Sequence, residues 1–185
     1  TPAPVGYFVN ETSSTGFYAC PNGQYQPLSG QFNCSLCPSG YFSDGPHQSS
    51  CQPCPVGRSS NLLGATICDV CVFGYYAPLV AQTSCTACPS GTFSLNSSST
   101  GNSACLSCSP GQFGNSTAAT SCFSCNPGSH QPLPGQVNCT SCELGKSGNG
   151  FGLVQCADCA TGKYQNLTGK IECAQCQLGA ISAVT

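Results

Sequence analysis

Cysteine is the residue whose number and regular spacing in this sequence indicate a chemical role. There are 19 cysteines among 185 residues, and all but Cys20 stand in C-x-x-C pairs. Successive pairs are 17 residues apart, except that one loop is three residues longer, through Asn96-Ser-Ser-Ser-Thr-Gly101. Cysteines at this density could form disulfides, hold zinc or carry out thiol redox reactions. The pairs are Cys34/Cys37, Cys51/Cys54, Cys68/Cys71, Cys85/Cys88, Cys105/Cys108, Cys122/Cys125, Cys139/Cys142, Cys156/Cys159 and Cys173/Cys176.

Zinc binding and thiol redox catalysis both fit this array poorly. Two neighbouring pairs have a spacing close to that of a zinc ribbon, which binds one ion with four cysteines. The array is uniform, however, and does not divide into groups of four. Redox catalysis by C-x-x-C needs a βαβ setting and a thiol of lowered pKa, and the sequence indicates neither. We therefore expect disulfides, with no metal ligands and no redox centre.

Each repeat carries a fixed glycine and usually an aromatic residue. Counted from the second cysteine of a pair, the repeat reads C-P-x-G-x-[Y/F], about eight variable residues, then C-x-x. An invariant fourth glycine predicts a backbone with positive φ, or an approach too close for a Cβ. We expect the sixth residue to pack beside the disulfide, and the alternative is that these rings stack on sugars or another ligand. The glycines are Gly6, Gly23, Gly40, Gly57, Gly74, Gly91, Gly111, Gly128, Gly145, Gly162 and Gly179, and the aromatic residues are Phe8, Tyr25, Phe42, Tyr76, Phe93, Phe113 and Tyr164.

The first repeat indicates which cysteines pair. Residues 3–19 fit the register, but Ala3 and Phe17 occupy the two cysteine positions. Two cysteines lost together, with no orphan thiol, are expected if these positions form one bond. We infer a sequential ladder from the end of each C-x-x-C to the start of the next. Its bonds are Cys20–Cys34, Cys37–Cys51, Cys54–Cys68, Cys71–Cys85, Cys88–Cys105, Cys108–Cys122, Cys125–Cys139, Cys142–Cys156 and Cys159–Cys173.

The ladder predicts three segments. Residues 1–19 are a degenerate first repeat without its disulfide, residues 20–175 are nine closed repeats, and residues 176–185 begin a truncated further repeat. Each closed loop of about 15 residues contributes roughly 3 kcal/mol in the chain-entropy model. Cys176 has no partner in the ladder, so either the sequence is a fragment of a longer protein or Cys176 bonds to another chain. The closed repeats start at residues 20, 37, 54, 71, 88, 108, 125, 142 and 159.

The composition limits what kind of protein this is. Leu, Ile, Val and Phe total 33 of 185 residues, too few for an ordinary hydrophobic core. A net charge of −2 with four Lys and Arg residues argues against nucleic-acid binding and against an electrostatic membrane anchor. No run approaches the roughly 18 apolar residues of a transmembrane helix, so we expect no direct membrane insertion in this segment. No signal peptide is visible.

Asparagine sequons indicate the secretory pathway. N-glycosylation takes place on secreted and surface proteins, where disulfides also persist. Covalent glycans are the only non-protein groups that we expect, and we expect no cofactor. The candidate sites fall mainly at repeat positions eight to nine and fourteen, and they are Asn10, Asn33, Asn96, Asn115, Asn138 and Asn166.

No residues of this sequence suggest an enzyme. His47 lies in a variable loop and His130 stands at the aromatic position. Hydrolysis would need a histidine beside a nucleophile, or paired carboxylates, and the carboxylates here are scattered. We therefore predict no catalytic residue. The carboxylates are Glu11, Asp44, Asp69, Glu143, Asp158 and Glu172.

The segments between cysteines predict turns and short strands. They are rich in Gly, Pro, Ser and Asn and show no helical periodicity. We expect a small disulfide-rich repeat protein, an elongated solenoid-like rod of short β-strands and turns with essentially no helix. Repeats that contact only their neighbours would stack at about 10 Å each, so ten would extend roughly 100 Å. The similarity of residues 26–34 to residues 131–139 suggests duplication of a six-repeat block.

The repeat resembles a known family. Gln82-Thr-Ser-Cys85-Thr-Ala-Cys88-Pro-Ser-Gly91-Thr-Phe93 resembles the ephrin-receptor-like cysteine-rich repeat, and is similar to the first half of a tumour necrosis factor receptor cysteine-rich domain. The resemblance implies an elongated, extracellular module, rich in β-turns, with a bond from first to second cysteine. The array lacks the additional interlocked cysteines of a full receptor domain. Such monotonous arrays are also typical of large surface proteins of protists and algae.

Two functions are compatible with these features. The first is a structural extracellular glycoprotein, a stiff disulfide-stapled rod in a cell-surface coat, filament or appendage. Its partners would be other copies of itself or other surface glycoproteins. The second is the ectodomain or stalk of a cell-surface receptor or adhesion protein that binds a protein ligand. Both place the chain outside the cell, secreted or at the cell surface.

Overall fold

The computed structural model describes residues 1–10, 16–95 and 101–177. The chain divides into two compact units, the first formed by residues 1–86 and 96–104 and the second by residues 87–95 and 105–185. The repeats are numbered here from repeat 1, which begins at Ala3, to repeat 10, which begins at Cys159, and positions within a repeat count from its first residue. The described residues form short hairpins and turns without a helix, which confirms the predicted class of small disulfide-rich repeats. In that part of the chain, no helix exists that is long and apolar enough to cross a bilayer.

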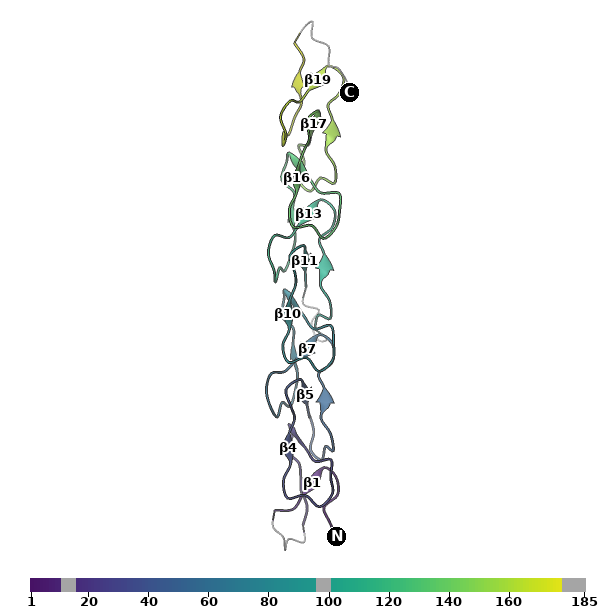
Figure 1. Cartoon of the computed structure of the whole chain (residues 1–185), viewed down its shortest axis with the longest axis vertical. Helices are drawn as coiled ribbons and strands as arrows, with labels where there is room; N and C mark the ends of the chain where they lie inside the picture. The colour runs from purple at the N-terminus through teal and green to yellow at the C-terminus, as the bar shows by residue number, and fades with distance from the viewer. Residues whose placement is uncertain (11–15, 96–100, 178–185) are drawn as a thin grey trace. The chain divides into compact units, whose positions relative to one another are not determined.

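Each described repeat contributes one hairpin of two-residue strands (Figure 1). The residues after the fourth-position glycine pair antiparallel with the residues after the second cysteine, as Tyr25 pairs with Ser35. In the first unit the strands are β1 (Tyr7–Phe8) with β2 (Tyr18–Ala19), β3 (Gln24–Tyr25) with β4 (Ser35–Leu36), β5 (Tyr41–Phe42) with β6 (Gln52–Pro53), and β7 (Arg58–Ser59) with β8 (Asp69–Val70). Strand β9 (Tyr75–Tyr76) pairs with β10 (Thr86–Ala87). In the second unit they are β11 (Thr92–Phe93) with β12 (Leu106–Ser107), β13 (Gln112–Phe113) with β14 (Phe123–Ser124), β15 (Ser129–His130) with β16 (Thr140–Ser141), β17 (Lys146–Ser147) with β18 (Ala157–Asp158), and β19 (Lys163–Tyr164) with β20 (Ala174–Gln175).

The fourth-position glycine starts the hairpin with a tight turn. Gly6 has a φ of +80°, and the N–H of the next residue, Tyr7, donates to the carbonyl oxygen of Pro4 at 3.1 Å. The carbonyl oxygen of Gly6 accepts a bond of 2.9 Å from the N–H of Cys20, which closes the hairpin. All ten of these glycines among the described residues have positive φ, between +76° and +85°, so the prediction is confirmed. Gly179 lies outside the described residues.

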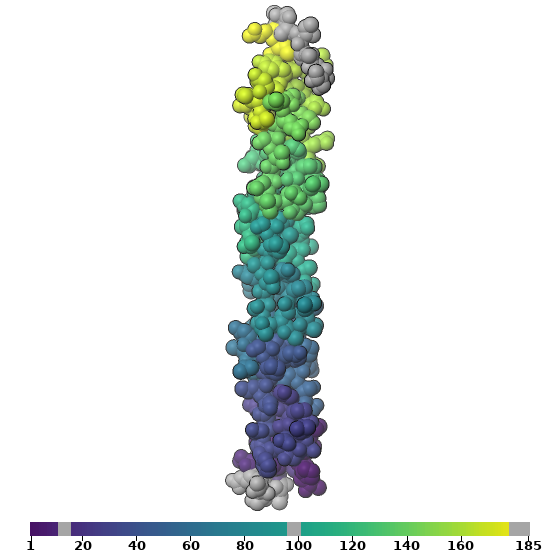
Figure 2. All heavy atoms as spheres, viewed as in Figure 1, coloured from purple at the N-terminus to yellow at the C-terminus, as the bar shows by residue number. Residues whose placement is uncertain are grey.

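Main-chain hydrogen bonds join each repeat to the next. In the first unit, the N–H of Gly23 donates to the carbonyl oxygen of Ser43 at 2.9 Å, and the N–H of Gly30 donates back to Ala3 at 2.8 Å. In the second unit, Gly111 donates in the same way to Gln131 at 2.7 Å. Figure 2 shows the result within each unit, where residues close in sequence also lie close in space.

Within each unit, a repeat also contacts the repeat after the next. A Cβ added to Gly6 would collide with the carbonyl oxygen of His47 in repeat 3. A Cβ on Gly111 in repeat 7 would meet the carbonyl oxygen of Gly152 in repeat 9 in the same way. The expectation that repeats contact only their neighbours is therefore wrong. Solenoid repeats ordinarily contact only their immediate neighbours. Here the backbone of the fourth-position glycine also touches a carbonyl group of the repeat after the next.

A second left-handed position lies at residue eleven of the repeat. It holds the carbonyl group that packs on the glycine two repeats earlier. Glycine fills the position in most described repeats, but His47, Ala81 and Ala118 adopt it with φ of 65°, 59° and 54°. Non-glycine residues pay about 1–2 kcal/mol for this conformation. The contact between the eleventh residue and the glycine two repeats earlier therefore stabilises the fold enough to hold a non-glycine residue at positive φ.

The cysteine that opens each repeat forms the buried core. These cysteines are almost completely buried in repeats 2 to 9, and Ala3 is 0% exposed at the same position of repeat 1. The seventh position is buried too, and it holds small residues such as Ser43 and Ala77 or the polar residue Gln131. Within each unit, buried disulfides thus take the place of the aliphatic core that the composition lacks. The buried opening cysteines are Cys20, Cys37, Cys54, Cys71, Cys88, Cys108, Cys125 and Cys142.

Candidate functional site: the disulfide ladder and its polar surroundings

Nine disulfides lie within the described repeats, one in each of repeats 2 to 10. Every bond closes one repeat, and the paired cysteines are separated by 14 positions in sequence, except for 17 from Cys88 to Cys105. Their Cα–Cα distances of 5.6–5.8 Å lie within the normal range for disulfides. The nine bonds are those of the ladder inferred from Ala3 and Phe17. Cys176 is the one free cysteine of the described residues, and it is partly exposed. The bonds are Cys20–Cys34, Cys37–Cys51, Cys54–Cys68, Cys71–Cys85, Cys88–Cys105, Cys108–Cys122, Cys125–Cys139, Cys142–Cys156 and Cys159–Cys173.

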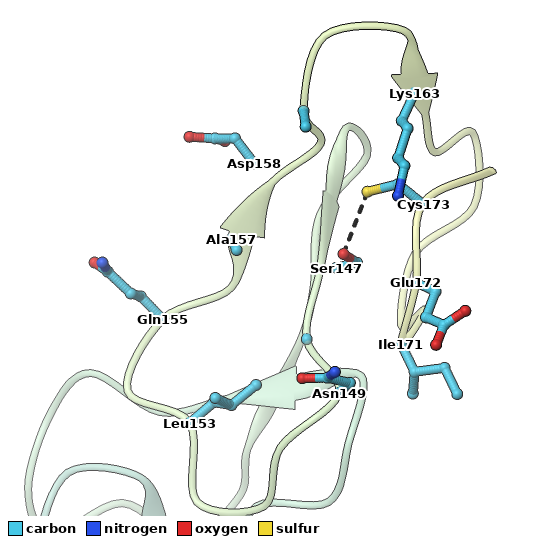
Figure 3. Close-up of a pocket in the computed structure, with 12 residues that line it drawn as sticks. Ser147, Asn149, Leu153, Gln155, Ala157, Asp158, Lys163, Ile171, Glu172 and Cys173 are labelled. Carbon is cyan, nitrogen blue, oxygen red and sulfur yellow. Dashed lines mark hydrogen bonds between the residues drawn. The ribbon is translucent and has the colours of Figure 1, made fainter. Parts of the chain in front are cut away.

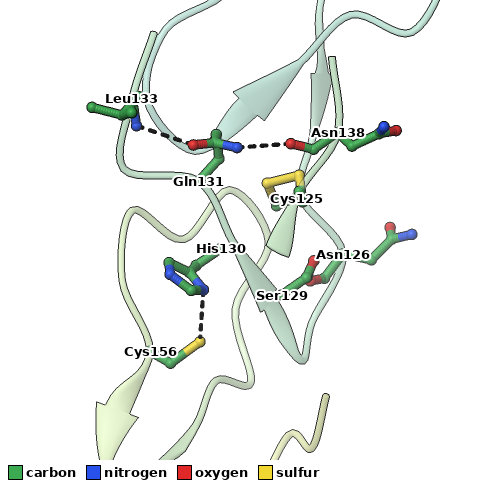
Figure 4. The surroundings of a disulfide bond; sticks show 9 residues. Cys125, Asn126, Ser129, His130, Gln131, Leu133, Asn138 and Cys156 are labelled. Carbon is green, nitrogen blue, oxygen red and sulfur yellow. Dashed lines mark hydrogen bonds between the residues drawn. A yellow bond between two sulfur atoms is a disulfide. The ribbon is translucent and has the colours of Figure 1, made fainter. Parts of the chain in front are cut away.

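A glutamine at the seventh position holds the loop that precedes the second cysteine. The Nε2 of Gln131 donates to the carbonyl oxygen of Asn138 at 2.7 Å, and its Oε1 accepts from the N–H of Leu133 at 3.1 Å (Figure 4). Gln26 makes the same two bonds in repeat 2, and Gln165 makes them in repeat 10. The shared glutamine of residues 26–34 and 131–139 therefore has the same structural role in both.

The sixth residue of a repeat contacts the disulfide of the next repeat where it is polar. Ser59 Oγ lies 3.3 Å from Cys85 Sγ, and Ser147 Oγ lies 3.2 Å from Cys173 Sγ. His130 Nδ1 lies 3.3 Å from Cys156 Sγ (Figure 4). In all three cases the partners are 26 residues apart in sequence.

The aromatic residues at the sixth position pack against protein. Most are partly buried, although Tyr164 is 44% exposed. Phe8 packs on Tyr18 across its hairpin with ring centroids 5.7 Å apart, and Phe113 packs on Phe123 at 5.8 Å. Such pairs stabilise a hairpin by fractions of a kcal/mol to about 1 kcal/mol. Both contacts join one ring to another, so packing of the sixth residue beside a disulfide stays a prediction.

The asparagines of the sequons lie on the surface. Asn10, Asn33, Asn115, Asn138 and Asn166 are exposed. Asn96 lies outside the described residues. Asn33 and Asn138 directly precede the second cysteine of a repeat, and the glutamine described above fixes their carbonyl groups. The side chains of the described candidate sites are therefore accessible to a glycan.

Two polar pockets lie side by side in the second unit and share Gln155 and Asp158. The larger, of about 500 Å³, is lined by Ser147, Asn149, Leu153, Lys163 and Glu172, among others (Figure 3). The smaller, of about 180 Å³, is lined by His130, Glu143, Lys146, Gln155, Cys156 and Asp158. Lys146 Nζ forms an ion pair with Asp158 Oδ1 at 3.8 Å across the β17–β18 hairpin.

The smaller pocket corrects the prediction that the carboxylates are scattered, because two of them, Glu143 and Asp158, line it together. Asp44, Asp69 and His47 are exposed and separate, and Glu11 lies outside the described residues. His130, Glu143 and Asp158, however, line one pocket. Sequence reasoning missed this grouping because it depends on how one repeat stacks on the next.

His130, Cys142 and Cys156 form the arrangement closest to a metal site in the described part of the chain. One ligand atom from each lies within 4.8 Å of the others. Cys142 and Cys156 are bonded to each other, however, so neither sulfur is a thiolate. Metal ions bind thiolates. With the disulfide formed, these residues therefore offer an imidazole and no thiolate.

Comparison with known proteins identifies the repeat. Residues 6–47, 29–71, 60–105 and 74–121 match the family model described as tyrosine-protein kinase ephrin type A/B receptor-like. No curated protein sequence matches the chain. Several solved structures match, among them a chain of the human RANKL/OPG complex, with 19% identity over 75% of this chain and 98% of that chain and a TM-score of 0.25.

The family matches overlap and together span residues 6–121, which is more than half of the 185 residues. Repeats of this kind are typical of extracellular domains, where oxidising conditions preserve disulfides. The nine disulfides and the hairpin of each described repeat agree with that setting. The chain therefore belongs to the ephrin type A/B receptor-like family, a family of non-catalytic cysteine-rich repeats.

Proposed function

We propose that the chain is a structural segment of an extracellular glycoprotein, a stiff array within a cell-surface coat, filament or appendage. The observation that carries this proposal is that, within each unit, a repeat contacts the next two repeats. Gly111, for example, bonds to Gln131 in the next repeat and packs on Gly152 in the repeat beyond it. A repeat fixed to two successors resists bending more than one fixed to a single successor. Stiffness of this kind suits a mechanical role.

Exposed leucines support association with other copies or other surface glycoproteins. Leucine recurs at the ninth position, and each copy is 54–66% exposed. In repeats 2, 8 and 10 the glutamine at the seventh position binds the N–H of the leucine and so fixes it at the surface. Fixed apolar side chains on a surface of low charge favour contact with another surface. The leucines are Leu28, Leu62, Leu79, Leu133 and Leu167.

Electron microscopy of native material tests the structural role. Ordered polymers or a surface lattice would support it, and isolated molecules on a membrane would contradict it. In the purified chain, Leu28→Ser, Leu62→Ser and Leu79→Ser together should lower association in sedimentation velocity. Ser116 already occupies the ninth position in repeat 7, so a serine there is compatible with the fold. Unchanged association would exclude these leucines as the contact.

Glycan mapping tests the glycoprotein part of the proposal. The exposed asparagines of five sequons support N-glycosylation, which would keep a chain of few charges in solution and cover strand edges. Peptide mass spectrometry of native protein, before and after enzymatic removal of N-glycans, measures the occupancy of each site. Unmodified asparagines at all of them would contradict this part.

The second candidate is the ectodomain or stalk of a receptor or adhesion protein. The match to a receptor-like family favours it. It predicts a distinct ligand-binding domain and a membrane span in the same full-length protein. Isolation of the native protein with a bound protein ligand, together with single membrane-attached molecules in micrographs, would support it over the first proposal.

A further inference from the structure

One disulfide of the second unit has an imidazole beside it. His130 Nδ1 lies 3.3 Å from Cys156 Sγ, and a ring nitrogen of His130 and both sulfurs of Cys142–Cys156 lie within 4.8 Å of one another. Figure 4 shows the ring of His130 directed at Cys156. A positive charge on this ring would therefore act on both sulfur atoms.

Two other repeats provide the same geometry without a charge. Ser59 contacts Cys85 at 3.3 Å, and Ser147 contacts Cys173 at 3.2 Å, each from the position that His130 occupies in its own repeat. The three contacts have the same sequence separation of 26 residues. What distinguishes His130 is its chemistry, because an imidazole becomes a cation near neutral pH and a hydroxyl does not.

The surroundings allow a small molecule to reach one sulfur. Cys142 is 0% exposed, whereas Cys156 is 8% exposed and lines the pocket of about 180 Å³. The charged groups that line this pocket with His130 are Glu143, Lys146 and Asp158, the last two being ion-paired. A small polar reagent therefore approaches this disulfide from the side of Cys156.

We propose that Cys142–Cys156 is a site of thiol–disulfide exchange assisted by His130. The thiolate of a small thiol attacks Cys156 Sγ, and a new S–S bond forms there while the Cys142–Cys156 bond breaks. The electron pair leaves on Cys142 Sγ, where the charge of the His130 imidazolium, within 4.8 Å, stabilises the thiolate until solvent protonates it. The products are a mixed disulfide on Cys156 and a thiol at Cys142, with no net oxidation. Such exchange is faster when the leaving thiolate is stabilised.

Glutathione is the probe that tests this site. The oxidised 185-residue chain is incubated with reduced glutathione from about pH 5.5 to about pH 8, a range that spans the ordinary titration of histidine. Samples are acid-quenched and alkylated, and peptide mass spectrometry follows each disulfide. The rate at Cys142–Cys156 is divided by the rate at Cys159–Cys173 in the same sample, which cancels the concentration of glutathione thiolate.

The ratio should rise as the pH falls through the range in which histidine becomes charged. This direction is expected because exchange is faster when the pKa of the leaving thiol is lower. Glutathione should be found on Cys156 and not on Cys142. A ratio independent of pH, or glutathione on Cys142, would overturn the proposal.

Two variants test whether the imidazole causes the pH dependence, one by removing it from repeat 8 and one by adding it to repeat 9. His130→Ser copies the residue of Ser59 and Ser147, and should make the ratio independent of pH. Ser147→His should raise the rate at Cys159–Cys173 at low pH, which tests the same chemistry even if the first variant misfolds. A pH-dependent ratio that survives in His130→Ser, or no gain in Ser147→His, would assign the effect to something other than the imidazole. Neither result bears on the structural role proposed above.

Discussion

Two backbone positions of each repeat decide how the repeats lock together. The fourth-position glycine has positive φ and no room for a side chain. The space beside it is filled by the carbonyl group of the eleventh residue of the repeat two further along the chain. Gly111 and Gly152 form such a pair in the second unit. Because the contact is between main chains, a single added methyl group is enough to disturb it.

Gly111→Ala should destabilise repeats 7 to 9. The substitution forces alanine into a left-handed conformation, at about 1–2 kcal/mol, and drives its Cβ into the carbonyl group of Gly152, which adds roughly 1–3 kcal/mol. Hydrogen exchange followed by mass spectrometry should show faster exchange of the amides of Gly111 and Gly152, whose N–H groups bond between repeats.

Gly145→Ala provides the matched control. Gly145 has a φ of +76°, but a Cβ there would have nothing within 4 Å. This variant should lose only about 1–2 kcal/mol of stability, which is the cost of placing alanine in a left-handed conformation. Equal losses in the two variants would show that the contact with Gly152 contributes little.

Ala118→Gly should stabilise its repeat. Ala118 has a φ of 54°, so glycine relieves about 1–2 kcal/mol of strain while adding about 0.5–1 kcal/mol of entropy to the unfolded chain. The expected net gain is on the order of 0.5–1 kcal/mol, measured by urea unfolding under non-reducing conditions. Ala77→Gly is the opposite control, because Ala77 is buried and lacks positive φ, and it should lose stability. A loss in Ala118→Gly would contradict this reading of the eleventh position.

At the scale of the element, a hairpin of two-residue strands cannot hold its own loop. Isolated two-stranded hairpins are marginal in water. In repeats 2, 8 and 10 the loop is held by a disulfide at one end and by the glutamine at the seventh position in the middle. The side chain of Gln131 makes two hydrogen bonds and is 6% exposed, so it acts as an internal brace.

Gln131→Met should loosen the loop of repeat 8. Methionine keeps the length of the side chain but makes neither bond, so the carbonyl group of Asn138 and the N–H of Leu133 lose their partner. The expected cost is about 1–3 kcal/mol, seen as faster hydrogen exchange at Leu133. Gln136→Met is the control, because Gln136 makes one exposed bond of 3.3 Å. If both variants exchange alike, the brace is unimportant.

At the scale of the whole molecule, each compact unit is held together by disulfides and main-chain bonds instead of a hydrophobic core. Replacing Cys54 and Cys68 by alanine together should cost about 3 kcal/mol, mainly by freeing the loop in the unfolded state. We expect repeat 4 to become locally mobile while repeats 2 and 3 keep their protection, because repeat 1 already lacks a disulfide and still forms β1 and β2.

Hydrogen exchange resolved by repeat, with intact disulfides elsewhere confirmed by non-reducing peptide mapping, measures this effect. Cys37→Ala with Cys51→Ala is the matched control, and it should move the loosened region one repeat earlier. Loss of protection throughout the first unit in either double variant would mean that the array unfolds as one cooperative body.

The sequence alone determined the repeat, its register and the chemistry of its cysteines. The 17-residue period, the invariant glycine and the absence of both cysteines at Ala3 and Phe17 can all be seen within one or two repeats. A bond between cysteines 14 residues apart follows from them. The positive φ of the fourth glycine was predictable for the same reason.

Only the tertiary structure decided how the repeats stack. Contacts such as Gly6 on His47 join main-chain groups that every residue possesses, so they leave no signature in residue type. The approach of His130 to Cys156 and the pocket that they share with Glu143 depend on this stacking. Covalent loops within a repeat can therefore be predicted from the sequence, whereas the geometry between repeats results from the packing of main chain on main chain.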